Sequence, residues 1–155
     1  MSVCVQGDVL EQLLRLLELE EIEENIFRGQ SQDMGFKNVF GGQVLGQALS
    51  AASYTVTPER SVHSLHAYFL RPGDDTKPIV YIVEPMRDGK SFTTRRVKAV
   101  QKGEPIFFMS ASFQREETGF DHQDGMPDVP GPEGIASAME LAKKLADQIP
   151  SGIRE

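Results

Sequence analysis

The sequence predicts an α+β protein in which one buried helix is wrapped by a single curved antiparallel sheet. Small and apolar residues at helical spacing begin at residue 42. Four segments with a two-residue alternation follow, and turn signals such as Asp88-Gly89 and Lys102-Gly103 separate them. A second, amphipathic helical pattern precedes both features. A helix followed by consecutive antiparallel strands can bury its apolar side against one sheet, which is an α+β arrangement.

The elements before the central helix are short. Leucine and valine residues at helical spacing predict a helix over residues 9–19. Four glutamates between residues 20 and 24 follow, and we expect them to form a solvated exit from this helix. A first strand is predicted over 26–31. The segment 32–40 is then a loop that leads into Gly41-Gly42.

The central helix combines an apolar stripe with a row of small residues. The apolar stripe consists of Val44, Leu45, Ala48, Leu49 and Ala52. The small residues beside it are Gly42, Gly46, Ser50 and Ser53. A glycine inside a helix costs about 1 kcal/mol relative to alanine. Gly46 therefore predicts that the helix lies unusually close to the sheet, and Pro58 marks the end of the unit.

Alternation also predicts which side chains face the helix. Strands are expected over 61–70, 78–87, 91–101 and 105–114. His63 is in phase with apolar residues of its strand, so we expect it to face the helix. Arg95 shares a face with valine and alanine, where it needs a carboxylate partner or an opening to solvent. The opposite rows are expected to form an apolar outer patch that includes Val62, Tyr68, Ile106 and Phe108.

Length and composition exclude several classes of protein. The 155 residues are enough for one domain with a real core. With 39% hydrophobic and 25% charged residues the chain is typical of soluble globular proteins. No apolar run approaches the roughly 20 residues of a membrane helix, and no signal peptide is expected. The single cysteine, Cys4, excludes a disulfide scaffold and favours a reducing, cytoplasmic setting.

The net charge of −7 is unevenly distributed. Residues 36–115 hold 11 basic and 6 acidic side chains, whereas the flanking segments are both acidic. A basic sheet suits an anionic small ligand, although ordinary segregation of surface charge explains it equally well. The negative net charge of the chain argues against nucleic acid as a partner. The three histidines and one cysteine lack metal-ligand spacing, so no metal site is expected.

The composition changes at Glu116. Residues 116–134 are rich in proline and glycine and predict a linker. Residues 135–148 have the pattern of a short amphipathic helix. The expected organisation is therefore an N-terminal helical extension (1–25), the helix-and-sheet domain (26–115), and a linker with a short helix that leads to a second domain absent from this sequence (116–155).

Several longer motifs occur in a fixed order along the chain. They are Phe27-Arg28-Gly29-Gln30, Phe40-Gly41-Gly42-Gln43-Val44-x-Gly46-Gln47-Ala48, His63-Ser64-x-His66-x-Tyr68-Phe69-Leu70-Arg71-Pro72-Gly73, Arg87-Asp88-Gly89-x-Ser91-Phe92-x-x-Arg95-Arg96-Val97, Gln101-x-Gly103-x-Pro105-Ile106-Phe107 and Ala111-Ser112-Phe113-Gln114. Over about residues 10–135 the chain resembles acyl-CoA thioesterase II. The resemblance implies two hotdog domains per full-length chain, of which this is the N-terminal one. It also implies that the full-length protein hydrolyses fatty acyl-CoA to free fatty acid and CoA without a cofactor. It places the family's Asp, Thr/Ser and Gln catalytic set in the second hotdog, so none of those residues maps onto this sequence.

Thioester hydrolysis needs an activated water and a stabilised oxyanion. The start of the buried helix, at Gly41, Gly42 and Gln43, is the candidate for the oxyanion because free N–H groups and the helix dipole favour negative charge there. A tight loop-to-helix turn is the other reading of the glycines. From Gly42 to Val56 the helix contains no Asp or Glu, and Gln43 cannot take a proton at neutral pH. His63 is the local candidate for a general base, with a structural histidine as the alternative.

Arg71, Arg96 and Lys98 are the candidates for contacts with the phosphates of CoA, although solvated surface is the default for such side chains. Two other functions stay open at this point. One is a non-catalytic acyl-CoA-binding or dimerisation module, which the missing helix carboxylate favours. The other is a hotdog dehydratase, which it disfavours. We expect the outer patch to pair with a second hotdog or with a second copy as a homodimer, unless residues 135–148 cover it.

Overall fold

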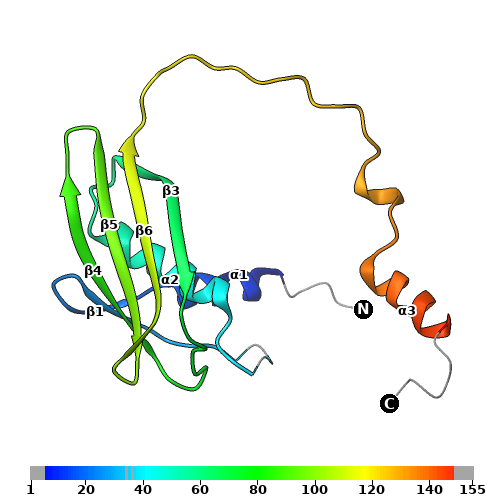
Figure 1. Cartoon of the computed structure of the whole chain (residues 1–155), viewed down its shortest axis with the longest axis horizontal. Helices are drawn as coiled ribbons and strands as arrows, with labels where there is room; N and C mark the ends of the chain where they lie inside the picture. Colours follow the sequence, from blue (N-terminus) through cyan, green and yellow to red (C-terminus); the bar gives the residue numbers. More distant parts are fainter. Residues whose placement is uncertain (1–5, 34, 36, 149–155) are drawn as a thin grey trace. The chain divides into compact units, whose positions relative to one another are not determined.

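Six strands form one curved antiparallel sheet around a central helix (Figure 1). The computed structural model describes residues 6–33, 35 and 37–148, so Cys4 lies outside the described residues. The helix is α2 (Gly41–Tyr54) and the strand order is β1-β2-β4-β5-β6-β3. The strands are β1 (Glu20–Glu23), β2 (Ile26–Gly29), β3 (Arg60–Phe69), β4 (Ile79–Asp88), β5 (Phe92–Gln101) and β6 (Glu104–Arg115). The predicted α+β class with one helix wrapped by the sheet is confirmed.

The N-terminal region contains a strand that the sequence did not predict. Helix α1 spans Gln6–Leu17, so it begins three residues before the expected start. The glutamates that follow are exposed, as expected, but Glu20–Glu23 form strand β1 on the edge of the sheet. Backbone pairing with β2 supports this strand, and the Nε of Arg28 donates to Glu20 at 2.8 Å. Such an edge strand needs no apolar side chain, so its sequence carries no alternation.

The core lies between α2 and the inner face of strands β4, β5 and β6. Alternate residues of each strand point inward, because successive side chains of a strand lie on opposite faces. The fully buried members include Tyr81, Val97, Phe107, Met109 and Phe113. They pack against the buried side of the helix, which consists of Gln43, Val44, Gln47, Ala48, Ala51 and Ala52. The central helix is therefore covered by the sheet along one side. This side shares Val44, Ala48 and Ala52 with the predicted apolar stripe.

A bulge in β3 reverses the faces expected for the start of that strand. The pairing with β6 shifts between Val62 and Ser64. Val62 pairs with Phe113, whose side chain is buried on the inner face. The prediction that Val62 belongs to the outer patch is therefore wrong. One extra residue in a strand moves every residue before it to the other face.

A second irregularity changes the expected position of Ile106. The pairing of β5 with β6 shifts between Ala99 and Val100, which leaves Ile106 outside the regular ladder. Ile106 is buried, so the prediction that it lies on the outer patch is also wrong. Its carbonyl accepts hydrogen bonds from the backbone N–H of Leu70 at 2.8 Å and of Arg71 at 3.2 Å. The outer patch is thereby reduced to Tyr68 and Phe108, whose rings stack with centroids 5.1 Å apart.

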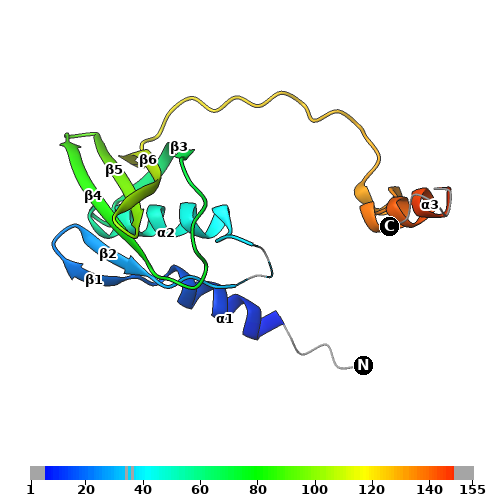
Figure 2. The same cartoon turned by 60° about the horizontal axis from the view of Figure 1, so that its bottom comes forward.

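Gly46 brings two helices together rather than a helix and a sheet. A Cβ at this position would lie 2.9 Å from the Cδ2 of Leu17 in α1. The close approach predicted from Gly46 therefore exists, but its partner is α1. Figure 2 shows α1 beside α2, on the side that the larger strands do not cover.

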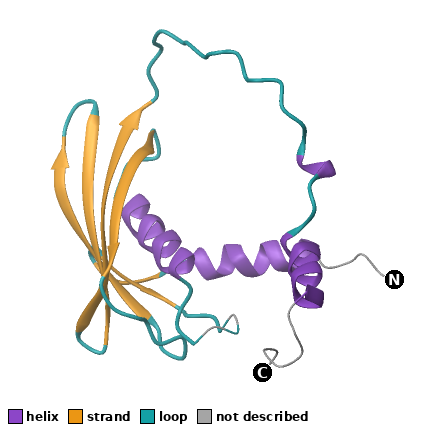
Figure 3. Ribbon diagram, turned by 45° about the vertical axis from the view of Figure 1, so that its right-hand side comes forward, coloured by secondary structure: helices purple, strands orange, loops and turns teal. Residues whose placement is uncertain are grey.

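The C-terminal part is a separate compact unit. The chain divides into Met1–Thr118 and Gly119–Glu155. The second unit contains a 3-10 turn at Pro132–Gly134 and the helix α3 at Ala138–Gln148 (Figure 3). The short helix predicted over 135–148 is present and begins three residues later. Among the described residues, the helices are all too short or too polar to cross a membrane.

Arg95 has the carboxylate partner that its inward position requires. Its Nη2 lies 2.8 Å from the Oδ1 of Asp88, and its exposed fraction is only 4%. It also donates to the hydroxyl of Thr55 at 2.8 Å and to the Thr55 carbonyl at 2.9 Å. The guanidinium thus joins the end of α2 to the hairpin between β4 and β5. The prediction of a structural ion pair is confirmed.

We expect the replacement Asp88→Asn to weaken the acid sensitivity of folding. The hydrogen bond from Arg95 holds the pKa of the Asp88 carboxyl below its usual range. A lowered folded-state pKa stabilises the fold above about pH 4, and this contribution is lost as the pH falls through the folded-state pKa. Urea unfolding from about pH 5 to pH 2 should therefore show a shallower loss of stability in the variant. Asp128→Asn, in the second unit, is the control, and equal slopes for wild type and Asp88→Asn would contradict the assignment.

Candidate functional site

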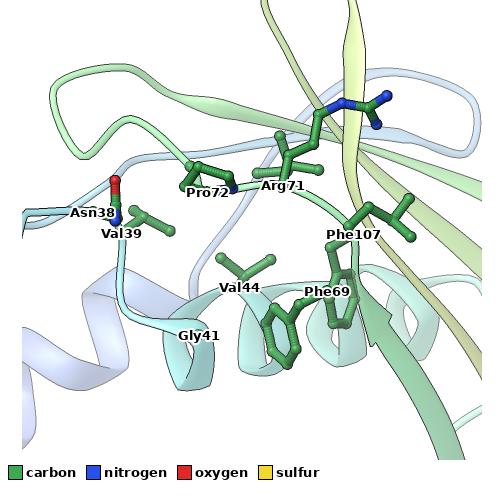
Figure 4. Close-up of a pocket in the computed structure, with 11 residues that line it drawn as sticks. Asn38, Val39, Gly41, Val44, Phe69, Arg71, Pro72 and Phe107 are labelled. Atoms are coloured by element: carbon green, nitrogen blue, oxygen red, sulfur yellow. The ribbon is translucent and has the colours of Figure 1, made fainter.

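A cavity of about 400 Å³ lies where α2 begins. Figure 4 shows it between the first turn of the helix and the segment that follows β3. Its lining is mostly apolar and comes from the loop before α2, the end of β3, the turn after it, and β6. The lining residues are Asn38, Val39, Gly41, Val44, Phe69, Leu70, Arg71, Pro72, Gly73, Ile106 and Phe107. Its position at a helix N-terminus makes it the candidate site for an anionic or carbonyl group.

Backbone hydrogen bonds hold the walls of this cavity together. The N–H of Val39 donates to the carbonyl of Gly73 at 3.0 Å, which joins the two loops. A Cβ at Gly73 would lie 3.1 Å from the side chain of Val39, so the loops approach closely there. The Gln101 side chain fixes the following turn, accepting from the N–H of Asp74 at 2.8 Å and donating to its carbonyl at 2.9 Å. The cavity is thus built by contacts between segments far apart in the chain.

The glycines at the start of α2 allow aromatic rings to cover the helix end. A Cβ at Gly41 would lie 3.1 Å from the ring of Phe69, and one at Gly42 would lie 2.5 Å from the ring of Phe40. The first N–H groups of a helix have no intrahelical acceptor. No acidic residue occupies the first turn of α2. The Gly41 backbone therefore presents the positive end of the helix to the cavity.

Arg71 flanks the cavity, but its charge is directed elsewhere. In Figure 4 the guanidinium points away from the space between Val44 and Pro72. Its Nη1 donates to the carbonyl of Pro105 at 2.7 Å, and its Nε lies 3.2 Å from a carboxylate oxygen of Glu104. The stem of Arg71 thus lines the cavity while its head is bound to the hairpin between β5 and β6.

Gln43 is buried and its amide is occupied by the backbone. Its Nε2 donates to the carbonyl of Gln30 at 3.1 Å, and its Oε1 accepts from the N–H of Gln32 at 3.3 Å. The side chain thereby fixes the loop that leaves β2. Gln43 does not line the cavity at Gly41.

His63 does not face the central helix, contrary to the prediction. It occupies the bulge in β3, and its Nε2 lies 2.8 Å from the Oγ of Ser112. Ser112 belongs to the outer row of β6, between the inward-facing Ala111 and Phe113. The His63 ring also makes an edge contact with Phe92 at 5.6 Å. The bulge turns the side chain to the outer face, because alternation holds only while the register is regular.

Arg96 and Lys98 lie on the outer face of β5, as alternation predicted. They border a shallow cavity of about 290 Å³ that Leu70, Pro105 and Phe108 complete. Arg96 is already paired there, with its Nη2 2.7 Å from a carboxylate oxygen of Glu84. The structure thus brings Gly41 together with Arg71 but places His63, Arg96 and Lys98 on the other side of the sheet. In the described ranges no cluster of His, Cys, Asp or Glu could hold a metal ion.

Sequence reasoning missed a buried polar network centred on Gln47. Its Oε1 accepts from the Tyr81 hydroxyl at 2.7 Å, and its Nε2 donates to the carbonyls of Leu16 at 2.7 Å and Gln30 at 2.8 Å. A Cβ at Gly29 would lie 2.7 Å from the Gln47 side chain, so the adjoining strand must carry glycine. Burial raises the pKa of Tyr81 well above its usual value. The available signal was a glutamine next to the apolar stripe of the helix.

A curved antiparallel sheet around one helix, with a cavity at that helix's N-terminus, defines a hotdog-fold protein. The protein-family model for the acyl-CoA thioesterase N-terminal domain matches residues 30–114 of the sequence. The chain belongs to this family, as its N-terminal hotdog domain. The motifs that carried the resemblance lie mostly within the matched range.

Curated relatives support the same assignment. The chain is 48% identical over 149 residues to acyl-CoA thioesterase 2 of Haemophilus influenzae, which covers 96% of this chain and 52% of the relative. It is 48% identical over 127 residues to human acyl-coenzyme A thioesterase 8, covering 81% of this chain and 40% of the relative. The chain therefore spans about half the length of the curated relatives it matches.

Solved structures share both fold and sequence. The acyl-CoA thioesterase II TesB2 from Mycobacterium marinum superposes with a TM-score of 0.69 at 52% identity, over 78% of this chain and 45% of that one. The tesB protein of Mycobacterium avium subspecies paratuberculosis gives a TM-score of 0.72 at 37% identity, over 80% of this chain and 49% of that one. A protein from Alicyclobacillus acidocaldarius that is described as having a hotdog fold gives a TM-score of 0.66 at 26% identity. The match covers 78% of this chain and 46% of that one.

Proposed function

We propose that this chain is the N-terminal half of a cytoplasmic acyl-CoA thioesterase that hydrolyses fatty acyl-CoA to free fatty acid and CoA without a cofactor. The observation that carries the proposal is the family match over residues 30–114, together with the cavity at the start of α2. Residues 26–115 are the hotdog domain, and residues 116–155 lead toward a second hotdog. The cytoplasmic location is supported by a sequence with one cysteine.

Thioester hydrolysis requires a group that stabilises the oxyanion and a group that accepts a proton from water. We propose that this half supplies the first and that the second hotdog supplies the other. Water adds to the thioester carbonyl carbon, negative charge develops on the carbonyl oxygen, and the C–S bond then breaks to release the CoA thiol and a carboxylate. The N–H groups at Gly41 and Gly42 are suited to the developing charge. A proton acceptor for the water must come from outside α2, because Gly42 to Val56 contains no Asp or Glu. The catalytic carboxylate is therefore proposed for the second hotdog.

The basic residues remain separate predictions for contacts with CoA. Arg71 is adjacent to the helix end and is proposed to lie near the phosphates when its pairing with Glu104 opens. Arg96 and Lys98 border the outer cavity and are proposed as an alternative contact. A non-catalytic acyl-CoA-binding or dimerisation module is the second candidate function. The missing helix carboxylate favours it for the chain considered alone.

A chimera tests the proposed function directly. This chain would replace the matched N-terminal half of the Haemophilus influenzae enzyme, and thiol release from palmitoyl-CoA would be measured. We expect the chimera to be active and the isolated C-terminal half of that enzyme to be inactive. A chimera that folds, as judged by circular dichroism, but releases no thiol would contradict the function and favour the binding module.

The proposed partner is a second hotdog or a second copy of this chain. Strand β3 is an edge of the sheet, and its Leu65 and Phe69 are 38% and 58% exposed although both lie in the inner row. Long edge strands with apolar side chains readily pair with other chains. The outward Tyr68 and Phe108 extend the apolar surface around this edge. Closed two-fold dimers are the commonest assembly.

We expect the isolated chain to form dimers at micromolar concentration. Sedimentation should give about twice the 17.2 kDa chain mass. Phe108→Asp should shift the equilibrium toward monomer, because it places a charge in the apolar surface beside β3. Gln114→Asp, at the far end of the same outer row, is the control and should leave the dimer intact. A monomeric wild-type chain would contradict the pairing.

A further inference from the structure

An apolar groove of about 430 Å³ runs between α1 and the first two turns of α2. Most of its walls are apolar. The lining residues are Val9, Gln12, Leu13, Leu16 and Leu17 from α1, Gln32 and Phe40 from the loop, and Gly42, Gln43 and Gly46 from α2. None of the side chains that line it is charged. The volume lies in the range of about 300–1,000 Å³ typical of sites for small molecules.

The groove leaves apolar side chains in contact with solvent. Val9 is 57% exposed and Leu13 is 50% exposed, although both belong to its wall. A contiguous apolar surface of this kind usually marks a binding site. Because no charge lines it, an uncharged hydrocarbon is the chemistry that matches the walls.

The groove begins next to the candidate site at the start of α2, although the two share no lining residue. Gly41 lines the cavity described above, and the next residue, Gly42, lines the groove together with Phe40. Gln43 also contributes to the groove, where its buried amide joins the backbone of the loop. A ligand whose carbonyl is held at the N-terminus of α2 would reach the groove by passing the Phe40 ring, which packs against Gly42.

The separation of the two helices is fixed by contacts already described. Gln47 donates to the carbonyl of Leu16 at 2.7 Å and holds the last turn of α1 against α2. The missing Cβ of Gly46 leaves room for Leu17. The last turn of α1 is thus tied down, while Val9 and Leu13 in its earlier turns form the open wall of the groove. This geometry produces a groove that is closed at one end.

We propose that the groove between α1 and α2 binds the hydrocarbon tail of an acyl group. The proposal rests on the proposed function and adds to it the location of the tail. The chemistry is shared by a fatty acyl-CoA and by a free fatty acid, so the test must separate the two. It also assigns α1 a role in substrate choice, because the close contact of Leu17 with Gly46 limits the length of the tail that the groove holds.

Binding measurements with three probes and matched variants test the proposal. The probes are hexadecyl-CoA, a thioether that cannot be hydrolysed, palmitate and CoA alone. Leu13 and Leu14 are neighbours on α1 with exposed fractions of 50% and 54%, but only Leu13 lines the groove. Leu13→Trp fills the groove, and Leu14→Trp is its control. Val9→Asp, which places a charge in the groove, is a second variant, and circular dichroism verifies that each variant folds.

We expect Leu13→Trp and Val9→Asp to weaken the binding of hexadecyl-CoA at least about tenfold. The reason is that each methylene of the ligand that is removed from an apolar environment costs about fourfold in affinity. Leu14→Trp should bind as wild type does, and affinity for CoA should be unchanged in all variants. Equal affinity of the Leu13 and Leu14 variants for hexadecyl-CoA would overturn the proposal while leaving the proposed function intact.

The remaining outcomes separate the proposal from the function on which it rests. Palmitate binding that depends on Leu13, without binding of hexadecyl-CoA, would support the groove and contradict the acyl-CoA function. Failure of wild type to bind any of the probes would overturn both. If Leu13→Trp changed the sedimentation of the chain but not its binding of hexadecyl-CoA, the groove would be a protein interface and the proposal would be wrong.

Discussion

The isolated chain is expected to release thiol from palmitoyl-CoA at least about a hundredfold more slowly than the Haemophilus influenzae relative. A positioned general base typically accelerates such a reaction by about 10²–10⁴. The buried polar side chains of α2, whose N-terminus is the proposed oxyanion site, are Gln43 and Gln47, and both amides are hydrogen-bonded within the fold. Neither can accept a proton at neutral pH.

His63→Ala is the informative control for this experiment. His63 is bonded to Ser112 on the outer face of the sheet, away from the start of α2. We therefore expect the residual rate to be unchanged by the substitution. Turnover by the isolated chain at the rate of the full-length relative would contradict the division of labour between the halves. A residual rate abolished by His63→Ala would show that the histidine reaches the substrate.

Replacing Gln47 with leucine is expected to cost about 3 kcal/mol of folding stability. The change removes the partner of the buried Tyr81 hydroxyl and of the Leu16 carbonyl, whereas the Gln30 carbonyl keeps its bond from Gln43. Each buried polar group left without a partner costs about 1–3 kcal/mol. The midpoint of thermal unfolding should fall by about 10 °C or more. Urea and thermal unfolding followed by circular dichroism would measure both quantities.

The double variant Gln47→Leu with Tyr81→Phe tests the cause of that loss. Removing the hydroxyl as well removes the need for its partner, so part of the stability should return. If the double variant were as unstable as the sum of the two single variants, Tyr81 and Gln47 would not be coupled. The lost hydrogen bond to the Leu16 carbonyl should remain visible as increased hydrogen exchange in the last turn of α1.

Local patterns were sufficient for most of the elements. The two-residue alternation located β4, β5 and β6 to within one residue, since a half-buried strand must alternate. Lys102 and Gly103 have φ values of 53° and 78°, which is the left-handed backbone that a tight hairpin of this type requires. The buried side of α2 followed only in part from its apolar stripe, because Leu45 and Leu49 are half-buried whereas Gln47 is buried. The strand at Glu20–Glu23 was missed because it is stabilised by backbone pairing at an exposed edge.

The candidate site was only partly accessible from the sequence. Gly41 and Arg71 were both predicted as substrate-binding residues, and the fold brings them to one cavity although 30 positions separate them. The direction of the Arg71 guanidinium depends on Glu104 and Pro105, which belong to another hairpin. The face of His63 depends on a single extra residue in β3. Neither property is local, so no pattern within the segment could reveal it.

The sequence by itself therefore determined the class of fold, the order of its larger elements and, through the resemblance, the family to which the chain belongs. These features depend on periodicity, turn residues and contiguous motifs, all of which are local. Only the tertiary structure decided which face each bulged residue takes, that Gly46 serves the contact with α1, and that Gln47 joins the two helices to Tyr81. The reason is physical: register and helix separation are set by contacts between segments that are distant in the chain.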